Sequence, residues 1–145
     1  MLKSILIPSC AILTLGIVGC ATTTNPSTER NLNELQNKNW VVSEVYGVAL
    51  SADPTQSDVP SIQFDNERVS GSDGCNRFMG GYAVKGTKIQ LSNLASTQKA
   101  CLNATDIPQK FIQALGEVTT YDASKKELKF IDANNKTVLK FKNVK

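Results

Sequence analysis

Apolar and polar residues alternate in short runs over most of the chain beyond residue 39, which predicts β-strands separated by turns. The first of these runs is rich in β-branched and aromatic residues, as strands usually are. Near the C-terminus, Asn134 and Asn135 stand between two runs and tolerate the positive φ of a hairpin loop. The expected strands are 40–46, 61–65, 68–70, 82–84, 88–91, 127–131 and 137–142.

One segment follows a helical spacing instead. Its apolar residues lie four, three, one and three positions apart, which places them on one face of a helix over about residues 105–117. They are Ile107, Phe111, Ala114, Leu115 and Val118. Thr105 or Asp106 is expected to cap the start, and Pro108 fits the first turn.

This apolar stripe can bind a partner, but we expect it to pack on the sheet. The predicted fold class is therefore α+β: a twisted, mainly antiparallel β-sheet, able to curl into a barrel, with one packed helix.

The first 19 residues have the order of a secretory signal. Lys3 supplies the positive start, and residues 5–18 are mainly apolar but too short for the roughly 20 residues of a membrane-spanning helix. A buried core helix is the alternative, which Pro8 disfavours. The end of the segment, Ile17-Val18-Gly19-Cys20, resembles the bacterial lipobox, in which the cysteine thiolate receives a diacylglycerol. We expect a signal peptide over 1–19 and a lipid anchor on Cys20.

The segment after Cys20 is polar, lacks apolar periodicity and contains a proline, so residues 20–31 are predicted to be a lipidated, flexible tether and 32–145 the folded domain. Ala21 follows the lipidated cysteine where an aspartate would favour retention in the inner membrane. By similarity to known lipoproteins, we expect the chain in the cell envelope, lipid-anchored in the outer membrane and facing the periplasm.

Composition narrows the chemistry. The chain of 145 residues fits one domain, and its net charge of +3 comes from scattered residues, which argues against a nucleic-acid surface. There is no histidine, so the commonest general base and the commonest metal ligand are both missing. The 13 acidic residues follow no grouping motif. We expect a protein that is not an enzyme and uses neither a metal nor a cofactor.

Of the four cysteines, Cys10 would leave with the signal and Cys20 would be acylated. The remaining two, Cys75 and Cys101, lack the partners of a zinc site and are not spaced as Cys-x-x-Cys. In an oxidising periplasm they are expected to form a disulfide. Two buried free thiols are the alternative.

Two blocks of sequence carry a family resemblance. Residues 68–82 contain Gly-Cys-Asn within a glycine-rich run, and residues 94–101 end in Ala-Cys. Together with Trp40 and the C-terminal hairpin, they resemble the META/HslJ-like domain. Lys99 departs from this pattern, because the family commonly has methionine there. The resemblance implies association with heat-shock or envelope-stress responses and, in some relatives, antibiotic tolerance.

The glycine-rich block is the candidate site. Gly71 and Gly74 are expected to allow a tight turn, Asn76 to hold turn amides, and Arg77 to bridge to a carboxylate. With Thr97 these residues form either a recognition loop or a structural corner, and we expect mainly the structural role for Asn76.

The function expected from the sequence is that of a non-enzymatic envelope lipoprotein. It would support envelope integrity or antibiotic tolerance by binding an envelope protein. A periplasmic inhibitor of a lytic or proteolytic enzyme is the alternative.

Overall fold

The computed structural model describes residues 26–50, 58–102 and 105–144. The predicted signal peptide, the lipidation site Cys20 and residues 21–25 lie outside the described residues. None of the helices in the described ranges is long and apolar enough to cross a bilayer.

Two helices and nine strands make up the described chain. In chain order they are α1 (Pro26–Leu35), β1 (Asn39–Val45), β2 (Val48–Ala49), β3 (Ser61–Phe64), β4 (Arg68–Ser72), β5 (Arg77–Lys85), β6 (Lys88–Ser96), α2 (Ile107–Glu117), β7 (Val118–Ala123), β8 (Glu127–Asp132) and β9 (Thr137–Val144). All of the strand pairs are antiparallel, in the order β2-β1-β3-β4-β5-β6-β7-β8-β9. The α+β prediction is confirmed.

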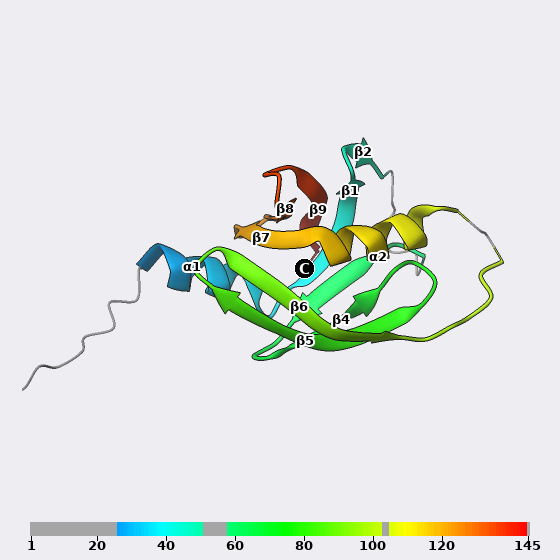
Figure 1. The fold of residues 1–145 in the computed structure, drawn as a ribbon, viewed down its shortest axis with the longest axis horizontal. Helices are drawn as coiled ribbons and strands as arrows, with labels where there is room; N and C mark the ends of the chain where they lie inside the picture. Colours follow the sequence, from blue (N-terminus) through cyan, green and yellow to red (C-terminus); the bar gives the residue numbers. More distant parts are fainter. Residues whose placement is uncertain (1–25, 51–57, 103–104, 145) are drawn as a thin grey trace, which may run out of the picture.

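The sheet closes on itself, because β1 also pairs with residues 139–144 of β9 (Figure 1). The weakest join in this ring is between β6 and β7, which share one register pair, Lys88 with Thr120. One further backbone bond, from Tyr121 N–H to Thr87 C=O at 2.9 Å, extends that join. Beyond it the two strands diverge, and α2 leads directly into β7 (Figure 1).

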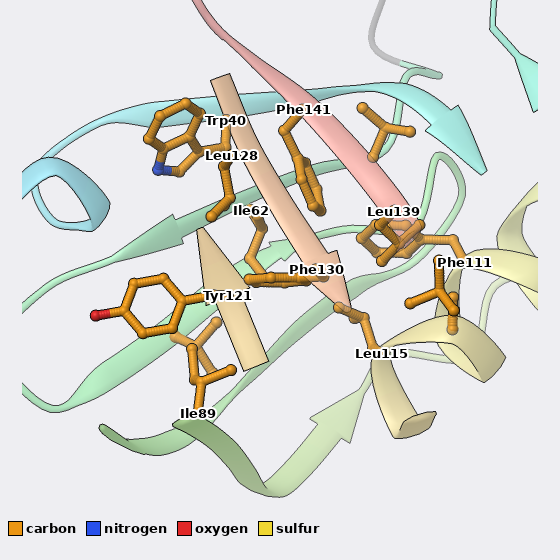
Figure 2. Close-up of a cluster of buried hydrophobic side chains, with 14 of the residues drawn as sticks. Trp40, Ile62, Ile89, Phe111, Leu115, Tyr121, Leu128, Phe130, Leu139 and Phe141 are labelled. Atoms are coloured by element: carbon orange, nitrogen blue, oxygen red, sulfur yellow. The ribbon is translucent and has the colours of Figure 1, made fainter. Parts of the chain in front are cut away.

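Large aromatic side chains fill the ring (Figure 2). Phe130 lies between Phe64 and Phe141, with ring centroids 6.1 and 5.2 Å away in edge-to-face geometry. Phe111 of α2 reaches the same cluster, with its centroid 6.3 Å from that of Phe141. Phe111, Ala114 and Leu115 are buried, which confirms that the apolar stripe of this helix packs on the sheet.

The ends of α2 differ in detail from the prediction. Asp106 occupies the N-cap position but makes no side-chain cap bond. Its carboxylate pairs with Lys110 at 2.6 Å instead, which lowers the pKa of Asp106. Val118, assigned to the helix stripe from the sequence, ends the helix with an extended backbone and begins β7, a strand that was not predicted.

Helix α1 overlaps the end of the segment that was predicted to be a tether. Residues 26–31, assigned to the flexible tether, are helical. This helix is tied to the ring, because Asn31 Oδ1 accepts the Ala123 N–H at 2.8 Å and Leu35 is fully buried. The Leu35 carbonyl accepts the indole N–H of Trp40 at 2.9 Å. Helix α1 therefore spans the predicted boundary at residue 32 and contacts the ring through Asn31 and Leu35.

Helix α1 marks one end of the molecule. Gln36, just after it, donates to the Tyr82 hydroxyl at 2.6 Å, so the second half of β5 lies at the same end. The connection from β6 to α2 lies at the opposite end of the long axis, as does the start of β5 (Figure 1). The chain therefore enters the ring at one end and carries its cysteine-containing turn at the other.

Candidate functional site: the Cys75 corner

The turn between β4 and β5 is built around the carboxylate of Asp73. This side chain is 5% exposed, and its Oδ1 accepts the backbone N–H groups of Cys75 at 2.7 Å and Asn76 at 2.6 Å. The Asp73 N–H in turn donates to the Asn76 carbonyl at 3.0 Å. Charge-assisted bonds of this kind are among the stronger ones in proteins. The corner is therefore a fixed structure before any partner is considered.

Gly74 is required by backbone geometry. Its φ is +97°, and a Cβ at this position would lie 2.6 Å from the carbonyl oxygen of Asp58. The prediction of a glycine-dependent turn is confirmed here. For Gly71 it is wrong: this residue lies within β4, where the missing side chain makes room for the Phe78 ring and the Ser61 carbonyl.

Asn76 joins this turn to the chain that follows β6. Its Oδ1 accepts the Lys99 N–H at 2.7 Å and the Thr97 hydroxyl at 3.2 Å. The Thr97 oxygen also accepts the Arg77 N–H at 3.1 Å, and the Thr97 N–H donates to the Arg77 carbonyl at 2.9 Å. Asn76 and Thr97 are thus brought together, as the sequence suggested, by bonds that the corner itself uses.

The two remaining cysteines are paired at the same place. Cys75 and Cys101 form a disulfide with their Cα atoms 6.0 Å apart, across a sequence separation of 26 residues. Cys101 is exposed and Cys75 is partly exposed. The bridge fixes the segment after β6 to the β4–β5 turn, beside the Asn76 bonds, so neither thiol is free in the structure.

Arg77 differs from its neighbours. Its side chain is exposed, and the ion pairs found among the described residues do not include it, so the expected bridge to a carboxylate is not formed there. Gly74, Asn76 and Thr97 are committed to the turn, whereas the guanidinium of Arg77 faces solvent. Of the four candidates, Arg77 is the one available for recognition.

Two contributors to this end of the molecule were missed. Asp73 was recognisable in principle, because Ser-Asp-Gly is a common turn sequence in which the aspartate accepts amide protons two residues on. Met79 is 66% exposed and lies two residues beyond Arg77 on β5, so the two side chains share a face. Strand periodicity alone does not reveal that both side chains are exposed in the described part of the chain.

No group of three or more histidine, cysteine, aspartate or glutamate residues capable of holding a metal occurs within residues 26–50, 58–102 and 105–144. The polar atoms of the corner are instead engaged with one another and with the backbone. What the described corner offers to another molecule is a rigid, disulfide-fixed surface that carries the exposed guanidinium of Arg77 and the exposed thioether of Met79.

Comparison with known proteins places this architecture in a family. A family model for the META domain matches residues 33–145, so the chain belongs to the META domain family. The fold is similar to that of a protein from Burkholderia xenovorans solved by NMR, with a TM-score of 0.62, 23% identity and coverage of 91% of this chain and 99% of that one.

A second NMR structure gives a TM-score of 0.59 at 26% identity, covering 76% of this chain and 92% of the other. A crystal structure of a DUF4847 family protein from Bacteroides vulgatus gives 0.53 at 18% identity, covering 74% of this chain and 93% of the other. No curated relative matches the sequence.

Proposed function

We propose that this chain is a non-enzymatic envelope lipoprotein that recognises a protein partner through the surface around Arg77 and Met79. The observation that carries this proposal is the rigidity of that surface. The disulfide between Cys75 and Cys101 and the Asn76 bond to Lys99 both fix the turn before β5 to the segment after β6. A preorganised surface loses little conformational entropy when it binds.

The position of this surface suits an anchored protein. Helix α1, which begins at Pro26, is at one end of the molecule, and the cysteine-containing turn is at the other (Figure 1). If Cys20 carries the lipid, the recognition surface points away from the bilayer. A membrane-distal surface is accessible to proteins of the periplasm.

The biological role follows from the family resemblance together with this placement. Signal-peptide cleavage before Cys20, acylation and sorting to the outer membrane would put the domain in the periplasm. There it would bind an assembly or maintenance protein during heat shock or envelope stress, and this binding would support envelope integrity and antibiotic tolerance.

The test is site-specific photo-crosslinking in intact cells, with the crosslinker placed at Met79. The matched control carries it at Lys126, which is exposed in the turn between β7 and β8. We expect one defined adduct from Met79, weakened by Arg77→Ala and missing from the Lys126 control. Equal labelling at both positions, or an adduct unaffected by Arg77→Ala, would contradict the proposal.

Mass spectrometry of the adduct separates the two kinds of partner. Membrane-assembly proteins support the integrity role. A single lytic or proteolytic hydrolase, inhibited by the purified domain, would replace that role with the inhibitor function.

A further inference from the structure

The divergence of β6 from β7 opens a pocket that the Cys75 corner does not use. After the Lys88–Thr120 pair the ladder between these strands ends, and a pocket of about 410 Å³ opens beside it. This volume lies within the range of small-molecule sites. The pocket is lined by Ala83, Val84, Lys85, Lys88, Ile89, Gln90, Val118 and Thr119.

The lining combines aliphatic surface with positive charge. Ala83, Val84, Ile89 and Val118 contribute carbon atoms, and both charged residues of the lining are lysines. An aliphatic surface next to cations suits a ligand that is apolar in one part and anionic in another.

The two lysines repel each other electrostatically. Lys85 and Lys88 are direct cross-strand partners at the β5–β6 turn, so their side chains leave the same face of the hairpin. Neither belongs to the ion pairs found in the described residues. Two like charges directly opposite each other destabilise a sheet, and an anion between them would remove that penalty.

We propose that this pocket binds an anionic amphiphile, with its aliphatic chain against the partly exposed Val84 and Val118 and its phosphate or carboxylate between Lys85 and Lys88. Aliphatic carbon gains free energy by leaving water, and the two ammonium groups pair with the head group. Together these contacts distinguish the ligand from a simple anion and from an uncharged detergent.

The source of the ligand is the membrane leaflet that holds the anchor. The β5–β6 turn lies at the α1 end of the ring, since Tyr82 of β5 bonds to Gln36 just after α1. In this part the inference rests on the proposed lipidation of Cys20, which would keep the pocket near anionic phospholipids. Binding of the amphiphile itself does not depend on the anchor.

Binding is measured on the mature chain, residues 20–145, with Cys20→Ser so that no acyl chain competes. This chain keeps every core residue, since all of these lie between Leu35 and Phe141. NMR titration below micelle-forming concentrations compares dodecyl phosphate, inorganic phosphate and dodecyl maltoside. We expect saturable shifts at Ala83 and Val118 with dodecyl phosphate, and much weaker effects with the other two. Equal binding of inorganic phosphate or dodecyl maltoside would overturn the proposal.

Charge variants locate the site. The double change Lys85→Gln/Lys88→Gln should weaken dodecyl phosphate binding about tenfold, as expected for the loss of two partly exposed charge pairs. Lys125→Gln/Lys126→Gln removes the same charge from the β7–β8 turn and should leave the affinity unchanged. If both pairs of changes weaken binding equally, the attraction is non-specific and the pocket proposal fails.

Two further measurements keep the outcome clear. Without ligand, Lys85→Gln/Lys88→Gln should melt at or above the temperature of the parent chain, because a repulsion is removed. Sedimentation of the same chain with vesicles of phosphatidylglycerol, but not with phosphatidylcholine, would identify membrane lipid as the source. If Cys20 is not acylated in cells, the anchor proposal fails, but the binding results in solution still stand. If dodecyl phosphate does not bind, the pocket proposal fails, but the proposals of a lipid anchor and of recognition at Arg77 still stand.

Discussion

The side-chain oxygen of Asn76 accepts the backbone N–H of Lys99 at 2.7 Å, across 23 residues of chain. This bond explains how a lysine is accommodated where the family commonly has methionine. The part of Lys99 that the corner uses is its backbone, which every residue type except proline supplies. The same contact makes Asn76 a structural residue and leaves recognition to its neighbour, Arg77.

Asn76→Ala should lower the free energy of unfolding by about 1–3 kcal/mol, because the Lys99 N–H and the Thr97 hydroxyl lose their acceptor. Thr97→Val, which replaces the hydroxyl with a methyl group, should act on the same network. Urea denaturation of both variants and the double variant should therefore show non-additive losses. Arg77→Ala is the control and should leave stability within about 0.5 kcal/mol. A large loss from Arg77→Ala with none from Asn76→Ala would reverse these assignments.

The Cys75–Cys101 bridge should contribute about 3.5 kcal/mol by the chain-entropy model for a loop of this length, less any native strain. If the chain is exported to the periplasm as proposed, protein isolated from that compartment should resist thiol alkylation under denaturing, non-reducing conditions. Reduction or Cys101→Ser should lower the melting temperature. Full alkylation of both thiols without a reductant would show that the bridge is not formed in cells.

Gly74→Ala and Gly86→Ala together separate the effect of backbone strain on stability from the effect of a steric clash. Both glycines have positive φ, +97° and +66°, but a Cβ at Gly86 meets nothing within 4 Å. Gly86→Ala should cost roughly 1 kcal/mol for the left-handed backbone alone. Gly74→Ala should cost clearly more, because the Asp58 carbonyl must also move. Equal losses in thermal melts would show that the Asp58 contact carries no energetic weight.

The free energy of unfolding should fall at alkaline pH because the Tyr121 phenol ionises less readily in the folded chain than in the unfolded chain. Burial raises the pKa of its phenol from 10.0 to about 12, and the side chain is 1% exposed. The unfolded chain therefore ionises first. The contribution of the neutral Tyr121 phenol to stability is complete below pH 10, declines between pH 10 and 12, and is lost above that range. Its total is about 3 kcal/mol, since one pKa unit corresponds to about 1.4 kcal/mol. Comparison of denaturation curves at pH 9 and pH 11.5 measures it.

Tyr121→Phe should reduce the loss of stability between pH 10 and 12. At neutral pH it should leave the free energy of unfolding unchanged, because the Tyr121 hydroxyl is buried without a hydrogen-bond partner in the described structure. Tyr82→Phe is the contrasting change. It removes the hydroxyl that accepts from Gln36 and donates to the Asp65 carbonyl, so it should lower stability at neutral pH. An unchanged alkaline decline in Tyr121→Phe would assign the effect to another group.

Local patterns predicted the strands well where one face is buried. Ile62 and Phe64 alternate with polar residues, and the structure buries both of them in β3. The far half of β6 was missed because residues 92–96 are exposed and carry no alternating apolar signal. β7 was missed because the burial of Tyr121 depends on its partner strand, with Phe130 opposite it. Ring closure also depends on tertiary pairing, which local periodicity does not encode.

At the site, residue type alone predicted the turn at Gly74 and the hydrogen-bonding role of Asn76, since few residues suit a positive φ or accept hydrogen bonds from turn amides. The partners of Asn76 were not readable in the same way, because Thr97 and Lys99 reach it only through the β5–β6 pairing. The position of Lys85 opposite Lys88 follows from a short turn. The pocket beside them depends on the distant strand β7, and so no local motif indicates it.

The pairing of β1 with β9 joins the two ends of the described sheet. Asn39 stands opposite Val144, so the first and last strands of the ring must meet before the ring is complete. A contact of such high sequence separation forms slowly, and it cannot form while the C-terminal strand is still being synthesised. The topology thus keeps the nascent chain from completing its fold early. If the chain is exported as proposed, that delay would preserve the unfolded state needed to thread a polypeptide through a narrow translocation channel.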